Sequence, residues 1–166
     1  HCQRGDEVIM GDRAHLYRYE VGAIATYGGV HVYTIPNDDH GGLNSADIEN
    51  AIRPDDVHFP RSVLLCLENT HNLCGGTVLG IDKINLMASV ASHNGLTMHL
   101  DGARIFNASI SLGVDVKELA RPFESVTFCL SKGLSCPVGS VVCGSADFIS
   151  KARGIRKSLG GAMRQS

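Results

Sequence analysis

The sequence predicts a three-layer α/β/α fold with a mainly parallel β-sheet. Short apolar runs rich in β-branched residues alternate along the chain with stretches of helical periodicity. Several of these runs are apolar almost throughout, which is typical of parallel strands covered by helices on both faces. The 166 residues suit a single domain, since we find no internal repeat, low-complexity tract or long linker among them.

Strands are predicted where short apolar runs lie between turn residues. The run Val63-Leu64-Leu65-Cys66-Leu67 is typical, because it is apolar throughout and is followed by Glu68. The expected strands cover residues 7–10, 30–35, 63–68, 96–100, 126–130 and 139–143.

Helices are predicted from apolar periodicity and from residues that cap helix ends. Residues 81–93 form the clearest one, because Ile81, Ile84 and Ala91 fall on one face and a glycine follows the end. Ser45 and Ser145 are the expected N-caps of helices over 45–52 and 146–156, each with acidic residues near its start. A further helix is expected to begin at Arg104.

Composition and charge exclude several classes of protein. The net charge of −2 disfavours a nucleic-acid-binding surface, which normally needs a basic surplus. No apolar run approaches the roughly 20 residues of a membrane-spanning helix. The six cysteines lie mostly inside apolar runs and are too few for a disulfide scaffold. We therefore expect reduced thiols and a cytoplasmic protein, with mitochondrial targeting by a preceding segment left open.

The first residues contain no initiator methionine and no signal peptide. We therefore expect the chain to be an excerpt of a longer protein.

Reactive side chains follow the carboxyl ends of two predicted strands. Asp101 follows the apolar strand over 96–100, and Lys132 follows the strand over 126–130 about one strand-helix-strand unit later. Because reactive residues gather at the carboxyl ends of parallel strands, both side chains are expected to face one cleft. A lysine amine that condenses with an aldehyde and an aspartate that pairs with a pyridine nitrogen suit pyridoxal phosphate chemistry. Spacing alone leaves open a surface lysine and an aspartate that caps a helix.

The sequence lacks complete motifs for a zinc site, a nucleophile elbow or a nucleotide-binding loop. Cys66, His71 and Cys74 lack the tight paired spacing of a zinc site, so no metal is expected. The segment Gly133-Leu134-Ser135-Cys136-Pro137 lacks the last glycine of a nucleophile elbow. The paired glycines at 28–29 and 41–42 match neither a P-loop nor a dinucleotide-binding motif.

Several blocks together resemble the low-specificity L-threonine aldolases of the β-eliminating lyase group, in one order along the whole chain. They are Glu68-Asn69-Thr70-His71-Asn72, His99-Leu100-Asp101-Gly102-Ala103-Arg104-Ile105-Phe106-Asn107, Phe128-Cys129-Leu130-Ser131-Lys132-Gly133-Leu134, Pro137-Val138-Gly139-Ser140 and Leu159-Gly160-Gly161-Ala162-Met163-Arg164-Gln165. The resemblance implies the large domain of a fold-type I pyridoxal 5'-phosphate enzyme. It also implies that residues 1–166 are part of this domain, without the preceding phosphate-binding loop and the small C-terminal domain.

The resemblance assigns roles to matching residues. Lys132 would hold the cofactor as a Schiff base, and Asp101 would bind its ring nitrogen. Arg104 would take the substrate carboxylate, for which a two-pronged donor is apt. His15 resembles a catalytic histidine that stacks on the cofactor ring, and His58 resembles a second one near the substrate β-hydroxyl.

The implied reaction is the retro-aldol cleavage of L-threonine or L-allo-threonine to glycine and acetaldehyde, in a homodimer or homotetramer. β-Elimination by the same cofactor and a non-catalytic fragment remain the alternatives. For His71, a structural and a functional role are equally open. The basic residues Arg153, Arg156, Lys157 and Arg164 either form a solvated face or help to hold the cofactor phosphate across a subunit boundary.

Overall fold

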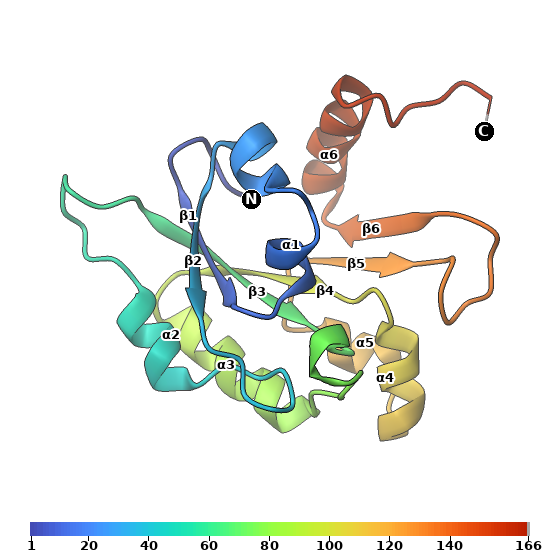
Figure 1. Ribbon diagram of the computed structural model, residues 1–166, viewed down its shortest axis with the longest axis horizontal. Helices are drawn as coiled ribbons and strands as arrows, with labels where there is room; N and C mark the ends of the chain where they lie inside the picture. Colours follow the sequence, from blue (N-terminus) through green and yellow to red (C-terminus); the bar gives the residue numbers. More distant parts are fainter. Residues whose placement is uncertain (166) are drawn as a thin grey trace.

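The computed structural model describes residues 1–165 and contains one six-stranded sheet in the order β2-β1-β3-β4-β5-β6 (Figure 1). Five strands are parallel, and β6 pairs antiparallel with β5 at one edge. The predicted α/β class and mainly parallel sheet are therefore confirmed. The strands are β1 (Glu7–Gly11), β2 (His31–Ile35), β3 (Ser62–Glu68), β4 (Thr97–Asp101), β5 (Ser125–Cys129) and β6 (Ser140–Gly144).

The helices agree with the predicted ones and add several short segments. The helices predicted over 45–52, 81–93 and 146–156 are present within about two residues of these limits. The longer helices are α2 (Ser45–Ala51), α3 (Ile81–His93), α4 (Ile105–Leu112) and α6 (Ala146–Ser158), and the shorter segments are α1 (His15–Arg18), η1 (Ile24–Gly28), η2 (Asn72–Cys74) and α5 (Val116–Ala120).

One predicted helix cap is wrong. Asn44, not Ser45, caps α2, because the Asn44 side chain accepts a hydrogen bond from the backbone N–H of Ala46 at 2.8 Å. Asn and Ser are similar as caps, so their order in the sequence could not decide between them. The predicted cap of α6 is confirmed, since Ser145 Oγ accepts from the backbone N–H of Phe148.

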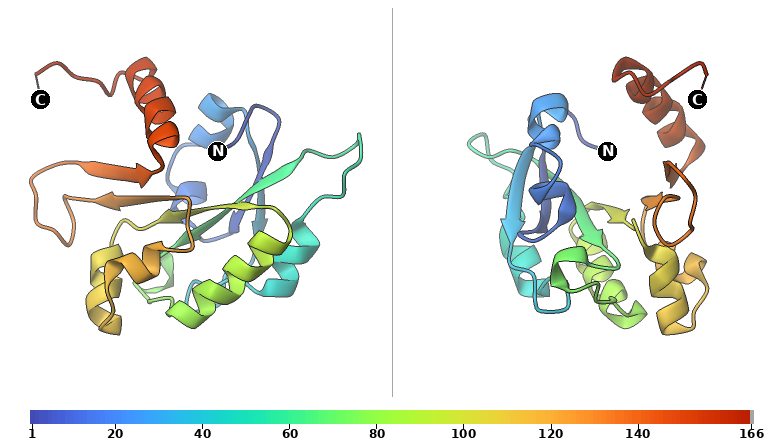
Figure 2. Two further views of the ribbon diagram at one scale, coloured as in Figure 1. Left: turned by 180° about the vertical axis from the view of Figure 1, so that it is seen from behind. Right: turned by 45° about the vertical axis from the view of Figure 1, so that its right-hand side comes forward.

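The two faces of the sheet are covered unequally. Helices α2, α3, α4 and α5 lie on one side, and the larger core cluster, which includes Ile9, Leu65 and Leu100, is packed beneath them (Figure 1). A smaller cluster around Met10 and Cys66 lies on the other side, near α1 and η1. Figure 2 shows α6 standing apart from α1 on this second side. The second face is therefore more open.

The strand order reverses between β1 and β3. The chain passes from β1 to β2 on one side and then returns to form β3 on the other side of β1. The segments that leave the carboxyl ends of β1 and β3 diverge at such a point, which opens a crevice where ligands of α/β proteins commonly bind.

No helix within residues 1–165 is long and apolar enough to cross a membrane. The six cysteines form no disulfide with one another within residues 1–165.

Candidate active site

The functional side chains come from the carboxyl ends of neighbouring strands. Glu68 is the last residue of β3 and Asp101 is the last residue of β4, and the two are partners in the parallel ladder. Side chains alternate between the faces of a strand. Because Leu67 and Leu100 point into the larger core, Glu68 and Asp101 point to the opposite, more open face. Both are buried, with exposed fractions of 5% and 7%.

These strand ends enclose a cavity of about 90 Å³ at the reversal point of the sheet. It brings together four of the five residues with predicted roles, which come from three different strand ends. The lining residues are His15, Glu68, Asn72, Asp101, Ala103, Arg104 and Lys132.

Asp101 is the buried anion of the cavity. Its Oδ1 accepts a hydrogen bond from the backbone N–H of Ala103 at 3.1 Å. Burial raises the pKa of Asp101, and the negative charge of Glu68 raises it further, while Ala103, His15 and Lys132 act in the opposite direction. In the described part of the chain, Asp101 forms no ion pair within 4.0 Å. A buried carboxylate that has no cation within ion-pair distance is costly, so the cavity favours a cationic ligand group.

Lys132 enters the cavity from the segment after β5. It is exposed, and its amine makes no ion pair or hydrogen bond with any residue in 1–165. The neighbouring Gly133 lies so close to α4 that an added Cβ would stand 2.1 Å from the Asn107 side chain. Glycine therefore lets this segment pack against α4, which places an unpaired amine beside Asp101.

His15 is the first residue of α1, the helical segment that follows β1 and a short connection. Its Nε2 lies 3.0 Å from Glu20 Oε1, and its ring is 5.3 Å from that of Tyr19. The Glu20 carboxylate thus orients an imidazole that lines the cavity.

Arg104 lines the same cavity directly after the Asp101-Gly102-Ala103 segment. Its guanidinium has no hydrogen-bond or ion-pair partner within the described residues. Such a free two-pronged donor suits a carboxylate ligand.

Three lining residues, Glu68, Asn72 and Ala103, had no predicted role. Glu68 Oε2 accepts from the backbone N–H of His15 at 2.7 Å, and Oε1 accepts from the backbone N–H of Asn72 at 2.9 Å. The available signal was the position of Glu68 at the end of an apolar strand, which is the same signal that identified Asp101.

His71 lies behind Glu68 and is 1% exposed. Its Nε2 is 3.8 Å from Glu68 Oε2, and neither ring nitrogen has a hydrogen-bond partner among residues 1–165. Burial lowers the pKa of His71, while the charge of Glu68 acts against this shift. Gly41 packs directly against the His71 ring, where an added Cβ would stand 2.5 Å from Cγ.

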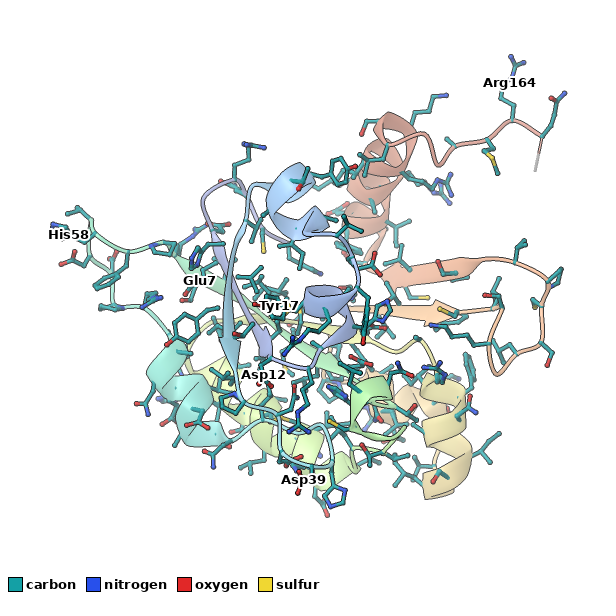
Figure 3. All side chains as sticks on the ribbon, in the orientation of Figure 1. Glu7, Asp12, Tyr17, Asp39, His58 and Arg164 are labelled. Carbon is teal, nitrogen blue, oxygen red and sulfur yellow. The ribbon has the colours of Figure 1, made fainter. Side chains whose placement is uncertain are left out.

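His58 lies far from this cavity. It belongs to the loop that precedes β3, so it is near the amino ends of the strands, whereas the cavity is at their carboxyl ends. Figure 3 shows it on the loop that protrudes from the sheet. Its side chain is 82% exposed, and Nδ1 pairs with Asp56 at 2.7 Å. The chain therefore does not bring His58 to its own Lys132, contrary to the expected place beside the substrate.

The predicted basic cluster is also outside the cavity. Arg153, Arg156 and Lys157 are on α6, and Arg164 is on the tail after it (Figure 3). Arg153 and Arg156 line a separate open groove of about 430 Å³ with Thr127 and Ser140. None of the four contacts the residues around Lys132 through an ion pair in the described structure.

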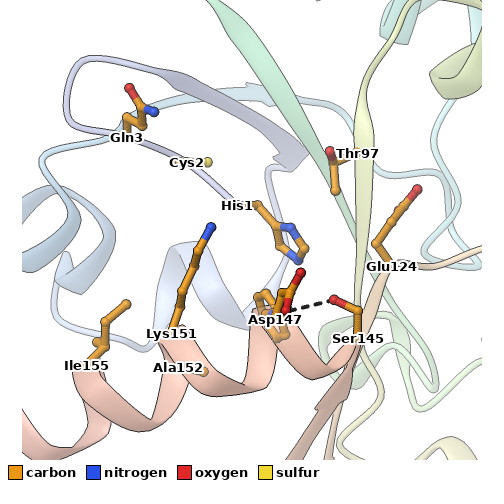
Figure 4. A pocket seen from close by; sticks show the side chains of 11 residues that line it. His1, Cys2, Gln3, Thr97, Glu124, Ser145, Asp147, Lys151, Ala152 and Ile155 are labelled. Carbon is orange, nitrogen blue, oxygen red and sulfur yellow. Dashed lines mark hydrogen bonds between the residues drawn. The ribbon is translucent and has the colours of Figure 1, made fainter.

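A larger groove of about 820 Å³ runs between the amino-terminal segment and α6 (Figure 4). It is next to Thr97 and Glu124, which lie at the amino ends of β4 and β5, and the ring of His1 stacks on Phe148 at 4.5 Å. It contains none of the predicted site residues. No group of three potential metal-binding side chains occurs within residues 1–165.

Residues 1–166 match the β-eliminating lyase family. The chain is 50% identical to a probable low-specificity L-threonine aldolase 2 of Arabidopsis thaliana, over 99% of this chain and 47% of the relative. It is 43% identical to the low specificity L-threonine aldolase of Escherichia coli K12, over 100% of this chain and 49% of the relative. The chain thus spans about half the length of these curated relatives.

Solved structures share the fold. A Leishmania major threonine aldolase matches with a TM-score of 0.80 at 25% identity, over 96% of this chain and 46% of that one. A putative L-allo-threonine aldolase of Listeria monocytogenes matches with a TM-score of 0.81 at 20% identity, over 95% of this chain and 42% of that one. The second likeness shows the fold alone.

Proposed function

Since the chain belongs to the β-eliminating lyase family, we propose that the whole protein is a pyridoxal 5'-phosphate-dependent threonine aldolase. It would cleave L-threonine and L-allo-threonine to glycine and acetaldehyde. One observation supports this most strongly: the exposed amine of Lys132 and the buried carboxylate of Asp101 line one cavity without forming an ion pair. The relatives at 43% and 50% identity that are named threonine aldolases support the same reaction.

The residues around the cavity fit the cofactor. Asp101 is buried and has no cationic partner within residues 1–165, so a protonated ring nitrogen would compensate its charge. Lys132 would supply the amine that holds the cofactor covalently. When bound, pyridoxal 5'-phosphate supplies an electron sink for negative charge on the substrate α-carbon.

The remaining residues bind and orient the substrate. Arg104 takes the substrate carboxylate with two parallel hydrogen bonds, which fixes the rotation of the amino acid and therefore which bond to the α-carbon breaks. His15, held by Glu20, would stack on the cofactor. Two nitrogen bases line the cavity, the His15 imidazole and the Lys132 amine, and one of them accepts the proton of the β-hydroxyl as the aldehyde leaves. His58 has no part in this step within its own chain.

A second reaction uses the same residues. In β-elimination a proton leaves the α-carbon, whereas in aldol cleavage the bond between the α- and β-carbons breaks. Arg104 suits both, because it holds the carboxylate in either case. The names of the relatives favour aldol cleavage.

Product analysis of the complete protein encoded by the gene tests the proposal. With L-threonine and the cofactor, we expect glycine and acetaldehyde in equal amounts. A keto acid with ammonia would establish β-elimination instead, and no turnover by a folded, cofactor-loaded protein would favour a non-catalytic role. The homo-oligomeric state, the cytoplasmic location and the large-domain assignment with its missing parts stay predictions.

A further inference from the structure

The two short helical segments beside the cavity have no caps of their own. Segment α1 follows Ala14 and segment η2 follows His71, and neither residue gives a side-chain hydrogen bond to the segment after it. The first backbone N–H groups of a helix need an acceptor from elsewhere. In both segments that acceptor is the carboxylate of Glu68.

Glu68 uses its two oxygens for two different parts of the chain. Oε2 accepts the first N–H of α1, at His15, and Oε1 accepts the first N–H of η2, at Asn72. These segments follow β1 and β3, the two strands between which the sheet order reverses. A single carboxylate therefore joins both walls of the crevice, and His15 and Asn72 on these walls line the cavity.

Several charged or titratable groups surround Glu68. Asp101 is its partner on β4, His71 follows it in the chain, and His15 comes from α1. Arg104 and Lys132 line the cavity with it. Arg13, in the loop after β1, lowers the pKa of His71, and Asp38, in the loop after β2, raises it. Burial is the main cause of the raised pKa of Asp101, and the negative charge of Glu68 raises it further.

We propose that Glu68 is a positioning residue of the cofactor site: its carboxylate fixes His15 and Asn72 around the cavity, and its charge adds to that of Asp101 in favouring a cationic ring. The inference rests on the proposed function for its ligand. The hydrogen bonds from Glu68 to the backbone N–H groups of His15 and Asn72 are expected in the protein without cofactor as well.

The Glu68→Gln variant tests both parts. The amide keeps one acceptor oxygen, but its NH₂ group faces a backbone N–H donor, so one cap is lost together with the charge. The matched control is Glu7→Gln. Glu7 is buried as well and accepts hydrogen bonds from Ser62 and Arg53, but it lies at the opposite end of the sheet.

The first measurement is amide hydrogen exchange of the cofactor-free protein. In Glu68→Gln we expect faster exchange at His15 or Asn72, about tenfold or more, because one cap is lost. Glu7→Gln should leave both amides protected. Equal protection in wild type and Glu68→Gln would overturn the capping part.

The second measurement is titration with pyridoxal 5'-phosphate, followed by the absorption of the Lys132-bound cofactor. In Glu68→Gln we expect the dissociation constant to rise about tenfold. We also expect the pH midpoint of the absorption change to fall by about half to one pH unit, because a nearby negative charge favours protonated forms. Glu7→Gln should keep the wild-type affinity and midpoint. A folded Glu68→Gln variant with wild-type values of both would contradict the inference.

The Glu68→Asp variant separates geometry from charge, and it replaces the Gln variant if that one does not fold. Aspartate keeps the charge but is one methylene too short to reach both N–H groups. We expect weaker cofactor binding with a nearly unchanged pH midpoint, and wild-type affinity would overturn the positioning role. If wild type itself shows no absorption that depends on Lys132, the proposed function fails, and hydrogen exchange alone decides the capping.

Discussion

Glu68 and Asp101 are direct partners in the β3–β4 ladder, so two buried carboxylates stand side by side at the carboxyl edge of the sheet. Adjacent like charges in a buried place raise the free energy of the folded protein. Both carboxylates line a cavity that Lys132 also lines, and Lys132 forms no ion pair within residues 1–165. This arrangement is best explained as a site built for a cationic ligand group rather than for stability.

Replacing Asp101 should therefore stabilise the cofactor-free protein. The pKa of Asp101 is raised in the folded state, so the folded protein binds this proton more tightly than the unfolded one. Stability is lost as the pH rises through the window that begins near the ordinary Asp value of about 3.9. At pH 7 we expect Asp101→Asn to gain about 0.5–2 kcal/mol in free energy of unfolding.

Thermal unfolding of cofactor-free wild type and Asp101→Asn at pH 7 and pH 4 measures this effect. The gain should shrink at pH 4. A lower melting temperature of the variant at pH 7 would refute the electrostatic account.

His99 gives a second dependence on pH. Burial lowers the pKa of His99 to about 4, and its Nδ1 is 2.7 Å from Ser125 Oγ. The unfolded chain takes up this proton near pH 6.5, whereas the folded protein does so only near pH 4. The contribution of neutral His99 is thus complete above pH 6.5 and is lost as the pH falls toward 4.

Denaturant unfolding at several pH values tests this window. Between pH 6.5 and pH 4, His99→Gln should lose less stability than wild type does. The exposed His93→Gln should follow the wild-type slope. Parallel curves for all three proteins would show that His99 is not the group responsible.

The two predicted catalytic histidines should differ in their effect on cofactor binding. His15 lines the cavity, whereas His58 is on an exposed loop at the other end of the strands. We expect His15→Asn to weaken pyridoxal 5'-phosphate binding about fivefold, since an aromatic contact contributes on the order of 1 kcal/mol. His58→Asn should keep the dissociation constant within about twofold of wild type. If an absorbance titration showed a larger loss of affinity in His58→Asn than in His15→Asn, the assignment of His15 to the cofactor site would be contradicted.

Gly102 should be intolerant of a side chain. An added Cβ would stand 2.9 Å from the backbone oxygen of Thr127, which is fixed because it accepts a hydrogen bond from Gly102 N–H at 2.8 Å. We expect Gly102→Ala to cost about 1–3 kcal/mol in free energy of unfolding. Gly154→Ala is the control. It lies in α6 with open space around it and should gain about 0.5–1 kcal/mol. Equal effects of both changes in a denaturant titration would contradict this steric argument.

The sequence predicted the strands and longer helices well, because their apolar periodicity is local. It also predicted that Asp101 and Lys132 share a cleft, since both follow parallel strands. The short segment α1 could not be predicted, because its cap is Glu68, which is distant in the sequence. The role of Glu68 depends on its register with Asp101, which no local pattern contains.

The position of His58 can be predicted from the topology of the sheet. A residue that precedes a parallel strand lies at the opposite edge from residues that follow one. His58 precedes β3, and Lys132 follows β5. The role of His58 came from the resemblance alone, which does not take into account at which end of the strands His58 lies.

The most direct test of the account is the absorption spectrum of the complete protein with pyridoxal 5'-phosphate, compared between wild type and Lys132→Ala. Since Lys132 is exposed and unpaired, the variant should fold as well as wild type does. We expect a visible absorption band of the bound cofactor in wild type and its loss in Lys132→Ala. Retention of the same band by the folded variant would contradict the assignment of Lys132 and with it the proposed function.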